Sequence, residues 1–350
     1  MAKYLVLLLV LLLSSCSKNS DDAQALLFEE QMFVLGTIVN ITIYGESDDK
    51  SQKVFHDLLT DFKYMQAAWN PWKKGSLSRV NKLLEASEQP FVIGPAVKRL
   101  IEQSSVLSRK SEGMFNPAIG GLIKIWGFHQ DEVPQGPPPP KALISTWLAQ
   151  KDSMEDLELN GLILKTSNRN IKLDFGAFAK GYGVDRAIEH LKSQGVDNAI
   201  VNAGGDLRAI GNKDGKPWVI GIRHPRGDSV IASLKISGDE SVFTSGDYER
   251  YYEYDGERYH HILDPRTGYP ANEFTSVTVV HQSAAVADAA ATALFVAGPQ
   301  AWERIANKMG VDQVMLIDKS GKLIMTPKME RRIELIATDH SMVVVSDKIK

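Results

Sequence analysis

Three clusters in the 350-residue chain have residue types and spacing that could carry chemistry. The densest spans residues 174–185 (DFGAFAKGYGVD), where a predicted strand ends in Asp174 and a predicted helix begins after small residues. Helix N-terminal amides can face an anion, and the ammonium of Lys180 could add positive charge beside a phosphate. The segment matches neither a Walker loop nor a dinucleotide fingerprint. It therefore predicts either a phosphate contact or a tight strand-to-helix turn with a solvated lysine.

The second cluster places two histidines before a turn, in residues 259–270 (YHHILDPRTGYP). Neighbouring side chains of a strand point to opposite faces, so only one of His260 and His261 can face a given site. An imidazole beside a turn that carries Asp264 is a reasonable general base near neutral pH. A lone histidine is more often structural, and both interpretations stay open from these residues.

The third cluster is Asp288 and Thr292 inside an alanine-rich predicted helix. Residues four apart share a helix face, so the carboxylate and the hydroxyl are neighbours. They could make local hydrogen bonds, or together offer hard oxygen ligands to Mg²⁺ or Ca²⁺. Two ligands on one helix are insufficient, so a backbone carbonyl and substrate phosphate oxygens would have to complete the coordination shell.

The periodicity of the chain predicts a mixed α+β fold, with no repeat and no sharp domain boundary. The first strand is predicted at 32–44, a helix at 48–68, and a loop at 69–75, where proline and glycine break both periods. The remaining predicted elements are helices at 78–86 and 95–111, a hairpin of 162–165 with 171–174, a helix at 178–194, a strand at 198–202 before a turn at 203–206, four or five strands within 218–263, the alanine-rich helix at 283–297 followed by another helix, and strands at 313–317 and 322–325.

Composition excludes several classes of protein and of site. The chain has 40 basic and 43 acidic residues, a formal net charge of −3, and one cysteine. Mixed charge near neutrality leaves no electrostatic footprint for nucleic acid. A single cysteine excludes an intramolecular disulfide framework and a cysteine-cluster metal site, so a metal would be held by oxygen or histidine.

That cysteine, Cys16, follows Lys3 and a ten-residue apolar run at 4–13. The run is too short to span a bilayer as a mature helix but fits the core of a signal peptide. An ordinary signal peptide with a chance cysteine is one interpretation. The leader resembles instead a bacterial lipoprotein signal, which predicts a signal peptide at 1–15, a lipidated Cys16, a polar tether at 16–27 and one domain at 28–350. The resemblance implies a cell-envelope protein that faces the periplasm from a membrane, and Ser17 favours the outer membrane.

The three clusters and further motifs resemble the ApbE family, the FAD:protein FMN transferases, many of which are periplasmic lipoproteins. The resemblance spans residues 32–325, and several independent motifs in the same order make it specific. The motifs are Met32 with Gly36-Thr37, Met114-Phe115-Asn116-Pro117, residues 174–185, 202–206 (NAGGD), 261–268 (HILDPRTG) and Asp288-x-x-x-Thr292. The resemblance implies an ApbE-like fold of mixed and antiparallel sheets flanked by helices.

The resemblance also implies roles for particular residues. It implies that Asp288, Thr292 and the backbone carbonyl of Ala177 bind Mg²⁺, with Ca²⁺ as an alternative. His261 is implied beside the transfer site, oriented by Asp264, with His260 outward or supportive. The implied contacts to FAD are Met32, Trp69, Met114, Phe115, Asn116, Asp174, Lys180, Gly204, Gly205, Asp206 and Ile262. The loop that carries Trp69 departs from the family, since Lys74-Gly75-Ser76-Leu77 stands where many members have Asp-Ser before a leucine.

The implied activity is Mg²⁺-dependent transfer of FMN from FAD to a threonine hydroxyl of a partner protein, with release of AMP. The implied partners are threonine-bearing subunits of membrane electron-transport complexes. Two alternatives remain at this point. One is an FAD pyrophosphatase that gives FMN and AMP, and the other is a lipoprotein that binds flavin without catalysis.

Overall fold

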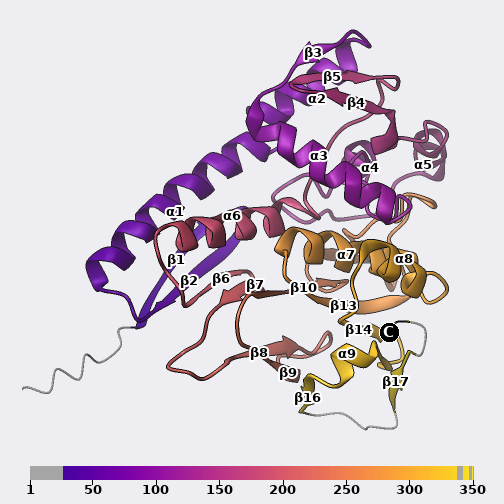
Figure 1. Ribbon diagram of the computed structural model, residues 1–350. Coiled ribbons are helices and arrows are strands. Elements are labelled where there is room, and N and C mark those ends of the chain that lie inside the picture. The colour runs from indigo at the N-terminus through magenta and orange to yellow at the C-terminus, as the bar shows by residue number, and fades with distance from the viewer. Residues whose placement is uncertain (1–26, 337–341, 347–348, 350) are drawn as a thin grey trace, which may run out of the picture.

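A computed structural model describes residues 27–336, 342–346 and 349 (Figure 1). The predicted signal peptide at 1–15, the lipidated Cys16 and nearly all of the tether therefore lie outside the described residues. Within the described part of the chain, no helix combines the length and apolar character that crossing a membrane requires.

The centre of the fold is a nine-stranded sheet in the order β1-β2-β6-β7-β10-β13-β14-β15-β17. Every neighbouring pair is antiparallel except β15 and β17. The strands are β1 (Leu27–Val34), β2 (Thr37–Tyr44), β6 (Ala199–Ala203), β7 (Asp206–Ile210), β10 (Glu240–Gly246), β13 (Phe274–His281), β14 (Val314–Asp318), β15 (Leu323–Met325) and β17 (Val343–Val345). The mixed α+β architecture expected from the sequence is confirmed.

Helices cover one face of this sheet and a second sheet lies against the other (Figure 1). The helices are α1 (Asp48–Trp69), α2 (Ser76–Ala86), α3 (Pro95–Lys110), α6 (Ala179–Ser193), α7 (Ala284–Ala297) and α8 (Trp302–Met309). The second sheet consists of β8 (Trp218–Arg223), β9 (Val230–Ile236) and β16 (Ile333–Leu335), and it encloses its own apolar core.

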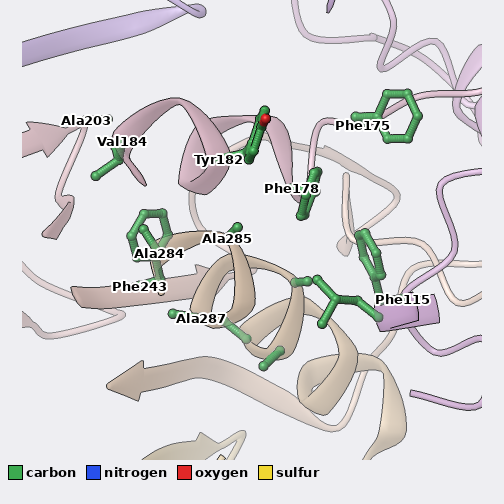
Figure 2. Packing of buried hydrophobic residues seen from close by; sticks show 14 of the residues in the cluster. Phe115, Phe175, Phe178, Tyr182, Val184, Ala203, Phe243, Ala284, Ala285 and Ala287 are labelled. Atoms are coloured by element: carbon green, nitrogen blue, oxygen red, sulfur yellow. The ribbon is translucent and has the colours of Figure 1, made fainter. Parts of the chain in front are cut away.

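The alanines of α7 let it lie at the centre of the molecule. All its residues except Val286 and Thr292 are buried, and their small side chains admit close neighbours. Figure 2 shows Phe178 and Tyr182, at the start of α6, above Ala284 and Ala285 of α7. The rings of Phe178 and Tyr182 stack with centroids 5.7 Å apart. The first turn of α6 is therefore held firmly against α7.

Most of the remaining elements form a cap beside the sheet. They are β3 (Phe91–Val92), β4 (Leu157–Asn160) and β5 (Ile163–Thr166) in one sheet, the hairpin of β11 (Tyr251–Tyr254) with β12 (Glu257–His260), the helices α4 (Gly120–Ile125) and α5 (Lys141–Leu148), and the 3₁₀ turn Met154–Asp156. Helix α9 (Pro327–Glu330) lies beside the second sheet instead, where Met329 joins its apolar core (Figure 1). A third apolar cluster, which includes Trp126, Phe128 and Tyr252, joins the hairpin to α4. This cluster fixes the strand that leads into the histidine pair.

Two sequence predictions about strands are wrong. The single strand predicted at 32–44 is the hairpin of β1 and β2, which turns at Leu35 (φ 53°) and Gly36 (φ 75°). Two consecutive positive φ angles suit a tight hairpin turn. The predicted hairpin of 162–165 with 171–174 does not form, because β5 pairs with β3 and β4. The Asn168 amide donates to Asp152, which ties the intervening turn elsewhere.

Candidate active site

The strand-to-helix segment begins with Asp174, whose amide donates to Pro117 O over 2.8 Å. Its carboxylate accepts from the Gly176 amide at 2.8 Å and from Nε1 of Trp72 at 3.0 Å. Burial raises the pKa of Asp174, while these hydrogen bonds and the positive charge of Arg250 oppose the rise. Asp174 is thus a desolvated carboxylate whose hydrogen bond fixes Trp72 at the start of the strand-to-helix segment.

Lys180 lies in the first turn of α6 and forms an ion pair with Asp206. Burial alone would lower the pKa of Lys180, but the carboxylates of Asp206 and Asp288 raise it. Asp206 is itself fixed, since its Oδ1 accepts from the Thr244 amide at 2.7 Å. A permanently charged ammonium therefore lies where the chain changes from loop to helix, next to two carboxylates.

Asp288 caps this helix from α7, because its Oδ2 accepts from the Gly181 amide at 2.8 Å. Burial, together with Asp206, raises the pKa of Asp288 to about 7, and Lys180 opposes the rise. A Cβ on Gly181 would lie 2.3 Å from Ala284 O and 2.8 Å from Cβ of Asp288. Glycine is therefore required for α6 and α7 to approach closely enough for this contact.

The oxygen donors around Asp288 suit a hard cation. Thr292 lies one turn further along α7, and its Oγ1 is 3.1 Å from Oγ of Ser245 on β10. Among the described residues, no group of three or more His, Cys, Asp or Glu side chains is placed to hold a metal. A cation here would depend on one desolvated carboxylate, with hydroxyl and carbonyl oxygens completing the shell, which is a donor set that Mg²⁺ and Ca²⁺ accept. The residues present fit such an ion.

His261 is the residue directly after β12. Its orientation is set by the backbone of Arg250, the residue directly before β11. The carbonyl of Arg250 accepts from the His261 amide at 3.0 Å and lies 3.2 Å from its Nδ1. A carbonyl only accepts, so this contact assigns the proton to Nδ1 and leaves a lone pair on Nε2. Burial, followed by the charges of His260, Arg250 and Lys180, lowers the pKa of His261 to about 3. The imidazole is therefore neutral near pH 7.

Asp264 does not orient His261, contrary to the prediction from the sequence. Its carboxylate accepts from the amide of Arg266 at 2.8 Å and pairs with the guanidinium of the same residue at 2.8 Å. Its carbonyl accepts from the Gly268 amide at 2.8 Å and closes the Asp-Pro-Arg-Thr-Gly turn. The nearby arginine outcompetes the imidazole because a bidentate, doubly charged pair is the stronger interaction. Asp264 stabilises the turn that follows the histidines.

His260 is buried, with 2% of its surface exposed, so the outward alternative is wrong and the supportive one holds. Its Nε2 lies 2.7 Å from Ala271 O, its Nδ1 accepts from the Ile262 amide at 3.3 Å, and its ring meets Phe295 edge-on. Burial lowers the pKa of His260 to about 4. Both ring nitrogens of His260 make hydrogen bonds that hold the end of β12, directly before His261.

This burial predicts how stability depends on pH. The unfolded chain protonates His260 near the ordinary value of 6.5, whereas the folded chain keeps it neutral down to about 4. The contribution is present above 6.5 and is lost as the pH falls toward 4, by about 3 kcal/mol at most. Urea unfolding across this pH range should show the loss, and His260→Asn should reduce its slope. An unchanged slope in the variant would contradict the assignment.

The flavin-contact prediction for Trp69 does not match its position. Trp69 is the last residue of α1, is 8% exposed, donates from Nε1 to Ala96 O at 3.1 Å and packs on Tyr182. Trp72, which the sequence reasoning missed, bonds Asp174, and its ring centroid lies 5.0 Å from that of His129. The sequence does contain this second tryptophan, directly after Pro71 in the same loop.

Several other predicted contacts surround these groups as support. Asn116 uses its amide to donate to Asp152 O at 2.9 Å and to accept from the Ala118 amide at 3.0 Å. Gly204, at φ 68°, brings the turn against Thr37, and the Gly205 amide donates to Asn202 at 2.8 Å. The buried members of the predicted set are Met32, Met114, Phe115 and Ile262, which lie in the main core.

The profile of the ApbE family matches residues 35–315 of this chain, which is more than half of its length. The chain belongs to the ApbE family. One curated relative, a FAD:protein FMN transferase of Rhodobacter capsulatus, is 36% identical to this chain. The match covers 88% of this chain and 58% of the relative's length. A FAD:protein FMN transferase of Vibrio cholerae is 32% identical, over 88% of this chain and 91% of the relative.

Solved ApbE structures share the fold. The ApbE protein of Thermotoga maritima superposes with a TM-score of 0.80 at 31% identity, covering 88% of this chain and 99% of that one. The flavin transferase ApbE of Vibrio cholerae gives a TM-score of 0.77 at 28% identity, over 88% and 99% of the two chains. The recognition of this family from sequence motifs is confirmed, and the fold with it.

Proposed function

We propose that this protein is a Mg²⁺-dependent FAD:protein FMN transferase, which moves FMN from FAD to a threonine hydroxyl of a partner protein and releases AMP. The observation that carries the proposal is the junction of α6 with α7, where Lys180 forms an ion pair with Asp206 and the Gly181 amide donates to Asp288 at 2.8 Å. A cation and a buried carboxylate able to hold a metal thus lie together at the start of α6. Relatives that match most of this chain are named FAD:protein FMN transferases.

Asp288, Thr292 and the carbonyl of Ala177 would hold the metal ion in this proposal, and Mg²⁺ is preferred over Ca²⁺. The bound ion would neutralise charge on the phosphoryl oxygens. Lys180 would add a second positive charge beside the pyrophosphate once that anion competes for the ammonium with Asp206. The N-terminal backbone amides of α6 lie at the same end of this helix as Lys180. They also favour an anion.

His261 would accept the proton of the attacking hydroxyl on Nε2, the nitrogen with the free lone pair. The threonine oxygen forms a bond to the phosphorus on the FMN side, and the bond from that phosphorus to the oxygen of AMP breaks. Lys180 and Arg250 help to keep the pKa of His261 low. The negative pyrophosphate would offset both charges and raise that pKa, so the imidazole becomes a better base when substrate is bound.

One assay tests this proposal against its alternatives. The protein is incubated with FAD, Mg²⁺ and an acceptor that carries a threonine, and products are followed by in-gel flavin fluorescence and chromatography. Fluorescent acceptor with equimolar AMP supports the transferase. Free FMN and AMP without labelled acceptor would indicate a pyrophosphatase, and intact FAD would indicate flavin storage. Either of the last two results contradicts the proposal.

We also propose that Cys16 is lipidated and anchors the protein to a membrane of the cell envelope, facing the periplasm. The support is the leader sequence, with its apolar run and two small residues before the cysteine. The proposed acceptors are subunits of membrane electron-transport complexes, which such an anchor would approach. Metabolic labelling with a radioactive fatty acid should mark the unchanged chain and not Cys16→Ser. Equal labelling of the two chains would contradict the anchor.

Trp72 is proposed as the aromatic contact to the flavin nucleotide. Trp72→Leu should raise the dissociation constant for FAD by about tenfold, the usual scale for losing one aromatic contact. Trp69→Leu is the matched control, because it removes a tryptophan from the core and should lower the Tm instead. Titration of FAD by tryptophan fluorescence and thermal unfolding separate the two effects. Unchanged FAD affinity in Trp72→Leu would leave Trp72 with a structural role only.

A further inference from the structure

Among the described residues, the outer face of the β1–β2 hairpin is covered at one end only, where Tyr44 packs against the core of the second sheet. The pairs Leu27–Tyr44, Glu29–Thr42, Gln31–Asn40 and Phe33–Ile38 are directly opposite one another, so they share one face. The opposite face carries Met32, Val34, Val39, Ile41 and Ile43, which are buried in the core beneath the helices. The second sheet covers the outer side of the neighbouring strands, with contacts from Ile200, Leu207, Ala209 and Val242. This cover reaches Tyr44 of β2 and includes no residue of β1.

This uncovered face carries large apolar side chains. Phe33 is 74% exposed, Ile38 is 50% exposed and Leu27 is 42% exposed. Across a surface hollow of about 550 Å³, lined in part by Leu27, Thr42, Tyr44 and Trp218, Val219 adds another apolar side chain with 64% exposed. The polar pairs Glu29–Thr42 and Gln31–Asn40 separate Leu27 from the Phe33–Ile38 pair, so the exposed apolar side chains form two groups on this face. Large apolar side chains in water carry a hydration penalty and mark a surface that meets another phase or partner.

We propose that this face, defined by Leu27, Phe33, Ile38 and Val219, lies on the surface of a phospholipid bilayer. Phe33 and Ile38 enter the boundary between the headgroups and the acyl chains. The proposal rests on the anchoring at Cys16 that is proposed above, and it adds which side of the domain meets the membrane.

The position of the anchor carries this choice of occupant. Cys16 precedes Leu27 by eleven residues, and Leu27 is both the first described residue and a member of the face. Even fully extended, eleven residues span at most about 40 Å. A lipid at Cys16 would therefore keep this edge of the sheet close to the bilayer. The exposed side chains of Phe33 and Ile38 then decide which face turns toward the lipid.

The charged residues around the hollow indicate which lipid headgroups the proposed contact requires. Lys213 and Lys216 line it together with Glu29 and Asp214, so opposite charges balance. Contact should depend on apolar insertion rather than on anionic headgroups. Neutral phosphatidylcholine vesicles are therefore the appropriate probe.

The same face leads into the candidate active site. The Gly204 amide donates to Ile38 O at 3.0 Å, and two residues later Asp206 pairs with Lys180. Contact at Ile38 would thus bring the edge of the site to the height of the headgroups. An acceptor segment just outside a membrane-embedded subunit lies at that height.

Because Cys16 is the one cysteine of the chain, a second cysteine can be labelled alone once Cys16 carries lipid. The lipidated full chain with Phe33→Cys is labelled with a small environment-sensitive maleimide fluorophore and reconstituted in phosphatidylcholine vesicles. The matched control is Val92→Cys on β3, where the native side chain is 61% exposed. Lipids with a nitroxide near the headgroup should lower the fluorescence at position 33 by about twofold or more, and leave position 92 unchanged.

Other results overturn the proposal in distinguishable ways. Equal quenching at both positions, or none at position 33 while the protein stays on the vesicles, leaves the anchor intact and removes this face from the membrane. Labelling of the unchanged chain at Cys16 means that its thiol is free, which removes the anchor and the inference together. Fluorescence at position 33 that depends on protein concentration in detergent, without lipid, would assign the face to a second copy of the chain.

Discussion

His261→Ala is expected to slow flavin transfer by roughly 10²–10⁴-fold, the usual contribution of a positioned general base. FAD affinity should stay close to that of the unchanged chain, because the imidazole faces the hydroxyl to be deprotonated rather than the groups that hold the nucleotide. Single-turnover transfer to a threonine-bearing acceptor gives the rate, and equilibrium titration with FAD gives the affinity. His56→Ala, at an exposed position of α1, is the control and should leave both unchanged.

The pH profile makes this test specific. The unchanged enzyme should lose activity as the pH falls, because protonation of Nε2 removes the base. In His261→Ala the remaining slow transfer should lack that limb of the profile. A variant with the unchanged rate and profile would remove His261 from the chemistry. A variant that loses FAD binding to the same degree as turnover would make His261 a binding residue instead.

Asp288→Asn is expected to remove the saturable dependence of turnover on Mg²⁺ and to lower the rate by about 10²-fold or more, because a buried charged ligand is replaced by a neutral amide. The asparagine oxygen can still accept from the Gly181 amide, a contact that measures 2.8 Å in the unchanged chain. The start of α6 should therefore stay folded. Isothermal titration with Mg²⁺ in the presence of FAD measures the loss of affinity, and the Tm checks the fold.

Thr292 provides a matched pair for the same site. Thr292→Ser keeps a hydroxyl on the shared face of α7 and should retain Mg²⁺ affinity, whereas Thr292→Val should weaken it. Unchanged Mg²⁺ dependence in both Asp288→Asn and Thr292→Val would contradict this location for the metal. Loss of Tm without loss of Mg²⁺ affinity would leave these residues with a structural role.

Much of the fold could be predicted from local patterns. The alanine-rich helix was visible because its period and composition agree with burial, and the α6 segment because a carboxylate, glycines and a helix start follow in order. The β1–β2 turn was missed because Leu35 adopts a positive φ, which leucine seldom does. No pattern of side-chain types predicts such a turn.

The site was predicted where its groups are side chains and missed where they are not. The partner of His261 is the carbonyl of Arg250, and a backbone oxygen leaves no mark on residue type. Asp264 was a reasonable expectation from proximity along the chain, but Arg266 lies closer and carries the opposite charge. The choice between Trp69 and Trp72 depended on where α1 ends, and helix ends are the boundaries that sequence predicts least well.

The close approach of α6 to α7 at Gly181 has a consequence for the energetics of binding. The turn that would meet an anion and the helix that would meet a cation come from segments more than a hundred residues apart, yet the hydrogen bond from the Gly181 amide to Asp288 joins them directly. Because the chain itself makes this contact, ligand binding does not have to spend free energy on bringing the two helices together. Any side chain at position 181 would separate them, and ligand binding would have to supply that closure anew.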